Sequence, residues 1–199
     1  MAGLVIKSVR CRRGATKIVV SRPFREGRDQ HVADTVAAVE IVPIAQGHIE
    51  SFHRSLDFVA RERRYLAFLE APPFESTRAF VLSNIEQGYP QLVAVSAGQV
   101  VGWCDVLANP RQIYAHVGVL GIALLPEFRR QGLGRRLIRQ TLDSARDCGL
   151  RRVELTVRES NVVAIELYKK FGFAIEGLQR NRILIDGAYE NLILMGVLF

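Results

Sequence analysis

The sequence predicts an α+β protein built on a mixed sheet. Strand-like segments follow one another directly in the first half of the chain, whereas in the second half they alternate with helical patterns. Alternation from end to end would predict a doubly wound parallel sheet, so this pattern favours a mixed sheet that contains antiparallel hairpins. Hydrophobic residues make up 49% of the 199 residues and charged residues 24%, which is typical of a globular protein with its own core.

In the first half, the segment 37–44 (AAVEIVPI) is rich in β-branched residues and predicts the first strand. Apolar residues then recur at intervals of three and four from 47 to 70, which predicts a helix. A second helix is expected over 75–87, where a Gly-Tyr-Pro sequence ends it. Two apolar segments on either side of Gly98 predict an antiparallel hairpin with a tight turn.

In the second half, the segment 115–125 is strongly apolar and predicts a strand that is buried on both faces. A helix is expected over 132–148, a strand over 151–157 and a further helix over 160–172. The chain then continues with two strands around the Asp-Gly pair at 186–187, a strong hairpin signal.

The positive charge is concentrated at the beginning of the chain. The formal net charge is +7, of which residues 1–38 carry +5. We therefore divide the chain into a basic N-terminal extension, 1–36, and a domain, 37–199; a transit peptide is the alternative interpretation of the extension. Because the domain itself has little excess charge, we expect no nucleic-acid partner.

Other signals are expected absences. The longest apolar run is about half of the ~20 residues that a membrane helix needs, and the N-terminus has no secretory apolar region, so we expect a cytoplasmic protein without a membrane partner. The three cysteines are widely spaced and form no CxxC pair, so no metal site is expected.

The segment RRQGLGRR, which opens the helix expected over 132–148, is the first candidate site. Free amides and the positive end of the dipole make a helix N-terminus an anion site, and glycine lets the backbone approach a phosphate closely. The spacing of Gly132 and Gly134 matches neither a Walker loop nor a Rossmann GxGxxG. We expect a pyrophosphate site; the alternative is a glycine-rich helix start with a solvated basic face.

The second candidate site is the helix that follows Asn161. Tyr168 lies seven residues further on, two turns later and on the same face. Taken alone, Asn161 would be a helix cap and Tyr168 a packed ring.

The two sites together resemble those of the GCN5-related N-acetyltransferase (GNAT) superfamily. The resemblance spans roughly residues 37–199 and is strongest in GIALLPEFRRQGLGRRLI and ELTVRESNVVAIELYKKFGF, with Arg129-x-x-Gly132-x-Gly134 matching the family's Arg/Gln-x-x-Gly-x-Gly/Ala pattern. It implies the GNAT fold: a mostly antiparallel central sheet, helices on both faces, and one splayed, bulged strand, with Gly118 and Gly121 consistent with the bulge. It also implies an acetyl-CoA-dependent N-acetyltransferase.

The resemblance assigns a role to each site residue. Tyr168 would be the general acid that protonates the departing thiolate. Asn161 and the main chain of the strand would hold the pantetheine arm and the acetyl end, and the loop after the strand would hold the pyrophosphate. The implied cofactor-binding residues are Ile122, Ala123, Leu124, Arg129, Arg130, Gln131, Gly132, Leu133, Gly134, Arg135 and Asn161.

The general base and the acceptor stay open at this stage. His116 is the titratable side chain nearest the expected strand and is one candidate base; a water wire is the rival. Arg63, Arg64 or Arg78 would bind an acceptor carboxylate, and Tyr65 or Phe74 would pack on its side chain.

The sequence looks closest to a bacterial branch that acetylates free L-amino acids and similar small amines. The ribosomal-protein branch is also similar, but it carries a glutamate where this chain has Thr156. A protein N-terminal or lysine acetyltransferase and a non-catalytic CoA-binding regulator are the alternatives, and a homodimer is one candidate assembly.

Overall fold

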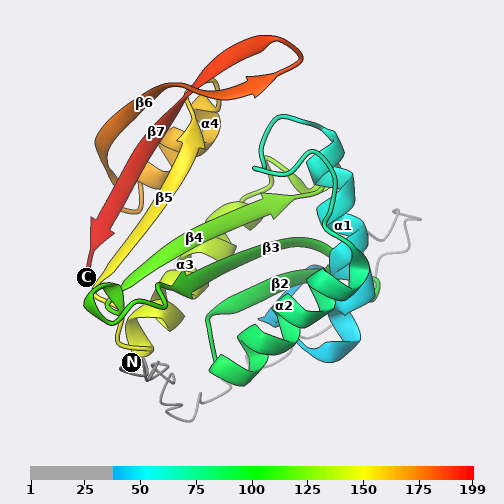
Figure 1. The fold of residues 1–199 in the computed structure, drawn as a ribbon. Coiled ribbons are helices and arrows are strands. Elements are labelled where there is room, and N and C mark those ends of the chain that lie inside the picture. Colours follow the sequence, from blue (N-terminus) through cyan, green and yellow to red (C-terminus); the bar gives the residue numbers. More distant parts are fainter. Residues whose placement is uncertain (1–37) are drawn as a thin grey trace, which may run out of the picture.

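The computed structural model describes residues 38–199, which form one seven-stranded sheet with order β1-β2-β3-β4-β5-β7-β6 (Figure 1). The strands are β1 (Glu40–Pro43), β2 (Gln91–Ser96), β3 (Gln99–Ala108), β4 (Val117–Leu124), β5 (Arg152–Arg158), β6 (Ala174–Ile185) and β7 (Ala188–Leu198). The helices are α1 (Ile49–Arg61), α2 (Phe74–Gln87), α3 (Leu133–Asp147) and α4 (Val162–Lys169).

The sheet is mixed, as predicted. Every pair of neighbouring strands is antiparallel except β4 and β5, which run parallel. The two predicted hairpins are present, and their turns use left-handed backbone at Gly98 and Gly187, which supports the tight reversal. The predicted α+β class is therefore confirmed.

Strands β4 and β5 separate after a short common ladder. They pair only over Val117–Val119 with Arg152–Glu154, and beyond this point β4 stays with β3 while β5 stays with β7. Figure 1 shows the resulting V-shaped gap between the two ribbons. The expected splay is thus present.

The ladder between β3 and β4 keeps a single register, so Gly118 and Gly121 mark no bulge on that side. Gly118 is explained by close packing, because a Cβ there would lie 2.4 Å from Val106 and 2.8 Å from Leu150. Burial of β4 also differs from the expectation, since Val119 is 45% exposed and the strand is not covered on both faces.

Helices cover both faces of the sheet (Figure 1). On one face α3 packs with the stripe that its periodicity predicts, and all of these residues are buried: Leu133, Leu137, Ile138, Leu142 and Ala145. On the other face α1 and α2 cover a second core, in which Phe52 meets the ring of Trp103 edge-on at 5.3 Å. The sheet separates the two cores, and Leu125, just after the end of β4, packs against both.

Helix α1 ends at Arg61, well before the predicted end at 70. Arg63 adopts a left-handed backbone (φ 56°), and the chain then turns back as an irregular segment, 62–73. The Asp57 carboxylate holds this return, because it accepts hydrogen bonds from Arg61 Nε at 2.7 Å and from the Ala71 amide at 3.0 Å. The prediction of a longer helix was wrong because these tertiary contacts override the periodic pattern. Helix α4 is likewise shorter than the predicted 160–172.

Within residues 38–199, no helix is both long and apolar enough to span a membrane. The predicted extension, 1–36, lies outside the described residues, so its division from the domain stays a prediction.

Candidate active site

The gap between β4 and β5 leaves main-chain groups of β4 without a strand partner. The Val117 carbonyl accepts from the Asn109 amide, and the Leu125 amide donates to the Val101 carbonyl, each at 2.9 Å. The main-chain amides and carbonyls of the odd-numbered residues of β4 therefore point toward β3. Alternation therefore turns the amides and carbonyls of Ile122 and Leu124 toward the gap. Those of Ala123 face β3 instead, so its main chain is not placed to hold a ligand in the gap.

The loop after β4 presents backbone amides at the start of α3. Gly132 is the N-cap residue with φ 79°, and Arg130 is also left-handed at φ 60°. The first amide recorded as a donor is Arg136, which bonds the Gly132 carbonyl at 3.1 Å; within residues 38–199, the amides of 130–135 have no recorded acceptor. A Cβ added at Gly132 would meet nothing within 4 Å. Open space beside free amides is the geometry of an anion site.

Gly134 has a different role from Gly132. A Cβ there would lie 3.5 Å from Leu124 and 3.7 Å from Leu167. The start of α3 therefore lies directly against the end of β4 and against α4, and this places the anion site next to the gap.

Arg129 is engaged by the protein itself. Its guanidinium forms a two-pronged ion pair with Glu62, with one contact at 2.8 Å, and its Nε donates to the Leu124 carbonyl at 2.8 Å. It also stacks over the Tyr65 ring at 4.7 Å. The predicted role of its side chain as a pyrophosphate ligand does not fit this geometry; Arg129 instead ties the end of α1 to the β4–α3 loop. Gln131 donates to the Glu127 carbonyl at 2.6 Å, also within this loop.

Asn161 and Tyr168 lie on α4 as predicted. The Asn161 side chain caps the helix by accepting from the Ala164 amide at 3.3 Å. Tyr168 is buried and packs on the Phe173 ring at 5.8 Å. Burial, and secondly the neighbouring Cys104, raise the pKa of the Tyr168 phenol. The phenol therefore keeps its proton at neutral pH, as a proton donor must.

His116 is not brought to the gap. It precedes β4, its side chain is exposed, and its carbonyl accepts from the Arg151 amide at 2.9 Å, beside the paired ends of β4 and β5. Six residues of strand separate it from Ile122, or about 20 Å.

Asp105 on β3 is an ionisable residue that the sequence analysis missed. It pairs with Gly121 of β4, and a Cβ at Gly121 would lie 3.1 Å from its Oδ1. Burial raises its pKa to about 7. The signal in the sequence was an acidic residue inside an otherwise apolar strand, QVVGWCDVLA.

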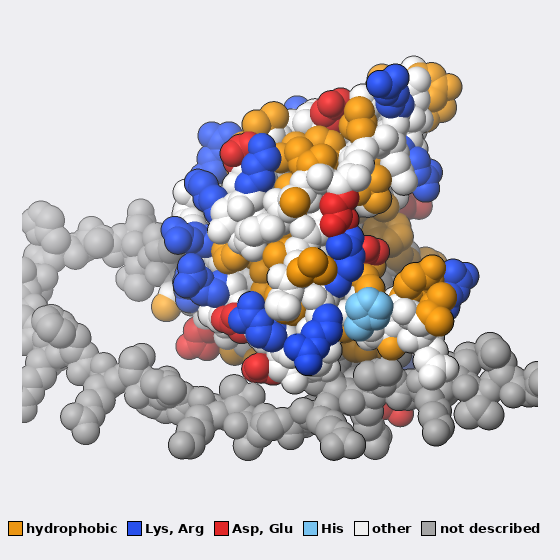
Figure 2. Space-filling view, turned by 90° about the vertical axis from the view of Figure 1, so that its left-hand side faces the viewer, with side chains coloured by type: hydrophobic (Ala, Val, Ile, Leu, Met, Phe, Trp, Pro, Cys, Tyr) orange, Lys and Arg blue, Asp and Glu red, His pale blue; other side chains and the backbone are white. Residues whose placement is uncertain are grey.

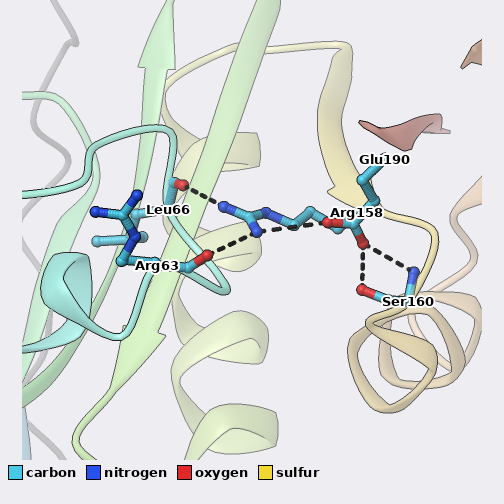
Figure 3. Close-up of polar contacts among 5 residues, drawn as sticks. All are labelled: Arg63, Leu66, Arg158, Ser160 and Glu190. Atoms are coloured by element: carbon cyan, nitrogen blue, oxygen red, sulfur yellow. Dashed lines mark hydrogen bonds and ion pairs between the residues drawn. The ribbon is translucent and has the colours of Figure 1, made fainter. Parts of the chain in front are cut away.

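The segment 62–73 is held over the end of β5 by Arg158, which the sequence analysis also missed. Arg158 is buried and donates to the carbonyls of Arg63 at 2.8 Å and Leu66 at 3.3 Å, and it pairs with Glu190 at 3.4 Å (Figure 3). Glu190 in turn accepts from the Ser160 hydroxyl. These contacts join the segment 62–73 to β5 and β7.

The predicted acceptor-binding residues are dispersed. The Arg63 guanidinium bonds Asp186 in the β6–β7 turn at 2.6 Å, and Arg78 pairs with Glu75 at 3.4 Å on the exposed side of α2. Phe74 packs edge-on against His53 at 5.4 Å. Arg64 is exposed and has no recorded ion pair within 38–199.

A separate concavity lies between α3 and the end of the C-terminal hairpin. It is lined by side chains that include Arg135, Arg139, Arg146, Lys170 and Phe199. Figure 2 shows the side of the molecule on which this hairpin lies, where basic side chains are interspersed with acidic and apolar ones. This concavity does not contain Tyr168 or Asp105.

The splayed parallel strands, the glycine-rich helix start and the buried tyrosine are the features expected of the GNAT acetyltransferase fold. The chain belongs to the acetyltransferase (GNAT) family, whose family model matches residues 56–173.

Relatives and solved structures agree with this assignment. A segment of 106 residues, 52% of this chain, is 37% identical to the L-amino acid N-acetyltransferase AaaT of Escherichia coli and covers 65% of that protein. Another of 79 residues, 40% of this chain, is 35% identical to the ribosomal protein bS18-alanine N-acetyltransferase of Escherichia coli and covers 53% of it. The matched segments thus span less than two thirds of these relatives.

The crystal structure of an acetyltransferase of the GNAT family from Streptococcus pneumoniae superposes with a TM-score of 0.76 at 27% identity, over 81% of this chain and 100% of that one. The predicted resemblance and fold are therefore confirmed.

Proposed function

We propose that this protein transfers the acetyl group of acetyl-CoA to the primary amine of a small free molecule, most simply an L-amino acid. The observation that supports this proposal is the set of contacts that hold the segment 62–73 beside the gap. The segment 62–73 is tied to the β4–α3 loop through Glu62 and Arg129, to the β6–β7 turn through Arg63 and Asp186, and to β5 through Arg158. A frame closed by three such ties favours a small acceptor over a folded protein.

In this proposal the gap holds acetyl-CoA. The main chain of Ile122 and Leu124 bonds the pantetheine arm, the amides of 130–135 bind the pyrophosphate, and Asn161 contacts the arm from α4. The amine attacks the thioester carbonyl carbon, the C–N bond forms, and the C–S bond breaks. Tyr168 gives its proton to the departing sulfur and recovers one from solvent; the net protonation is favourable because a thiol with a pKa of about 8.5 is mostly protonated at neutral pH.

Two relatives point to different acceptors, and the chain itself distinguishes them in one respect. The relative named as an L-amino acid N-acetyltransferase has the higher identity, 37% over 106 residues, whereas a relative from Bacillus subtilis named as a putative ribosomal protein bS18-alanine N-acetyltransferase matches over a longer segment, 133 residues at 33%, so the length of the match favours neither acceptor. Thr156, where the ribosomal-protein branch carries a glutamate, is exposed on β5 and offers no carboxylate. Acetylation of a protein N-terminus or lysine is the second candidate function.

The test is thiol release from acetyl-CoA with a panel of L-amino acids, polyamines, aminoglycosides and peptides with free N-termini. We expect turnover with one or more free amino acids and none with peptides. Turnover with peptides alone would show that the acceptor is a protein amine and not a free amino acid. Acetyl-CoA binding without turnover on any amine would indicate a CoA-binding regulator. The cytoplasmic location and the homodimer stay predictions.

A further inference from the structure

Asp105 has features that a structural role does not explain. It is 8% exposed, yet no hydrogen bond or ion pair to its carboxylate is recorded within residues 38–199. A buried carboxylate without a partner is costly, so proteins rarely keep one unless it has a function.

The carboxylate keeps contact with solvent. In the described part of the chain, two side-chain polar atoms are fully buried and lack a hydrogen bond: Gln91 Nε2 and Arg158 Nε. The Asp105 oxygens also lack a hydrogen bond, but they are not fully buried. Both oxygens therefore keep some contact with solvent.

The position of Asp105 relative to the gap is specific. Its partner across the ladder, Gly121, lies on β4 just beyond Val119, the last β4 residue that pairs with β5. On β4, Ala123 is buried under α1 and α2, while Val119 on the same face is 45% exposed. Asp105 thus lies at the boundary where the cover of α1 and α2 ends. Glycine at 121 leaves the space in front of its Oδ1 free of a side chain.

Asp105 and Tyr168 lie on opposite faces of the sheet. Tyr168 belongs to the core beneath α3 and α4, together with Cys104, the chain neighbour of Asp105. Successive side chains of a strand point to opposite faces, so Asp105 points to the face of α1 and α2. An amine that enters from the face of α1 and α2 would attack the thioester carbonyl from that side. The CoA sulfur would then leave toward Tyr168 on the other side.

We propose that Asp105 is the general base that takes a proton from the amino group of the acceptor. This inference rests on the proposed N-acetyltransferase function. An acceptor arrives as R–NH3⁺; the carboxylate takes one proton and leaves R–NH2, whose lone pair forms the C–N bond. The second proton leaves nitrogen for solvent as the C–S bond breaks, and Tyr168, which has given its own proton to sulfur, takes one back from solvent. Asp105 returns its own proton to solvent before the next cycle.

The electrostatic surroundings of Asp105 suit this role. Burial raises the pKa of Asp105, and strands β2 and β4 beside it contain no titratable residue. On α1, Asp57 pairs with Arg61 and His53 bonds Thr77. The other ionisable side chains of α1 are Glu50 and Arg54, and the thiol of Cys104 is the neighbour on β3. A base with a pKa near the working pH combines an ionised form with useful basicity.

The test compares wild type with Asp105→Asn, which keeps the shape and removes the base. We expect turnover at pH 7 to fall by about 10² to 10⁴-fold, the usual contribution of a general base. The deficit should shrink as pH rises through the amine's own pKa, about 8 to 10, because the acceptor then arrives deprotonated. Acetyl-CoA affinity by calorimetry should be unchanged. Asp147→Asn, an exposed acid at the end of α3, is the matched control and should retain full turnover.

A second measurement does not depend on turnover. Because the folded pKa of Asp105 lies above the ordinary carboxyl value of 3.8, ionisation disfavours the folded state. The penalty is absent below the unfolded pKa and complete above the folded one, so wild type should lose stability relative to Asp105→Asn as pH rises from about 4 to about 7. The Tm difference between the two should widen by several degrees over that window.

The outcomes are distinguishable. If wild type acetylates an amine and Asp105→Asn does so equally at every pH, the base assignment is wrong while the proposed function stands. The base assignment is also wrong if His116→Ala, and not Asp105→Asn, removes the dependence on pH near 7. If wild type acetylates no amine of the panel, the proposed function fails and the base with it.

Discussion

At the scale of single residues, the site separates side chains that meet the gap from those that only support it. Tyr168 and Asp105 are buried ionisable groups on opposite faces of the sheet, and burial raises the pKa of both. For a phenol this preserves the donor form, whereas for a carboxylate it creates a base near neutrality. One physical effect therefore produces an acid and a base from two residues.

Replacing Tyr168 by phenylalanine removes the hydroxyl and keeps the ring that packs on Phe173. We expect turnover to fall by about 10² to 10⁴-fold with little change in acetyl-CoA affinity, because the proton transfer occurs only in the transition state. Steady-state kinetics and calorimetry measure the two effects. Wild-type turnover in the Phe variant would mean that the ring only packs the core and that solvent protonates the thiolate.

At the scale of elements, the start of α3 and the segment 62–73 have different roles beside the gap. The start of α3 offers free amides and open space, whereas the segment is held by side chains from three other elements. The first should therefore govern the cofactor, and the second the acceptor and the stability of the domain.

The glycine at the start of α3 can be tested with a matched substitution at its end. Gly132→Val should weaken acetyl-CoA binding at least tenfold, about 1.4 kcal/mol, because a side chain would occupy the open space beside the amides. Both Gly132 (φ 79°) and Gly149 (φ 86°) are left-handed with no atom within 4 Å of an added Cβ. Gly149→Val therefore has similar backbone strain and should lower Tm without affecting calorimetric binding. If the two variants bound acetyl-CoA with equal affinity, the prediction that this loop binds the pyrophosphate would be wrong.

The side chain of Arg158 makes two of the hydrogen bonds that hold the segment 62–73. Arg158→Gln leaves two carbonyls without their donor and Glu190 without its cationic partner, although Glu190 keeps its bond from Ser160; losing one partner of a buried pair costs about 3–5 kcal/mol. We expect a Tm loss of roughly 6 °C or more and a higher KM for the amine. Arg78→Gln, which breaks an exposed pair on α2, should change stability by about 1 kcal/mol or less. A small, equal effect of both changes would show that the segment does not depend on Arg158.

At the scale of the whole molecule, one sheet carries two cores, one on each face, and the gap opens between its strands β4 and β5. Residues 38–199 contain the splayed strands, both cores and every residue assigned to the site. This organisation predicts that the domain works without the basic extension.

Deletion of residues 1–36 should leave Tm and turnover nearly unchanged, because that segment is basic and poor in periodic apolar residues. Thermal unfolding and the thiol-release assay check this directly against the full chain. A large loss of either would mean that the extension packs on the domain or completes the site.

The sequence by itself determined the features that depend on neighbours along the chain. The period of α3 identified its buried stripe, the Asp-Gly pair located the β6–β7 turn, and the glycine spacing located the helix start that now faces the gap. Each of these signals lies within one continuous segment of the chain, where side-chain periodicity and backbone preference act directly.

The tertiary structure alone decided which of the marked residues are available for chemistry. Arg129 has the spacing of a phosphate ligand, yet its charge is taken by Glu62, 67 residues earlier. The helical pattern continues past Arg61, yet contacts with Asp57 and Arg158 turn the chain back. Asp105 is one acid among many in the sequence, and only its burial beside Gly121 makes it a base. Pairing and desolvation arise between distant segments, and a local pattern carries no record of them.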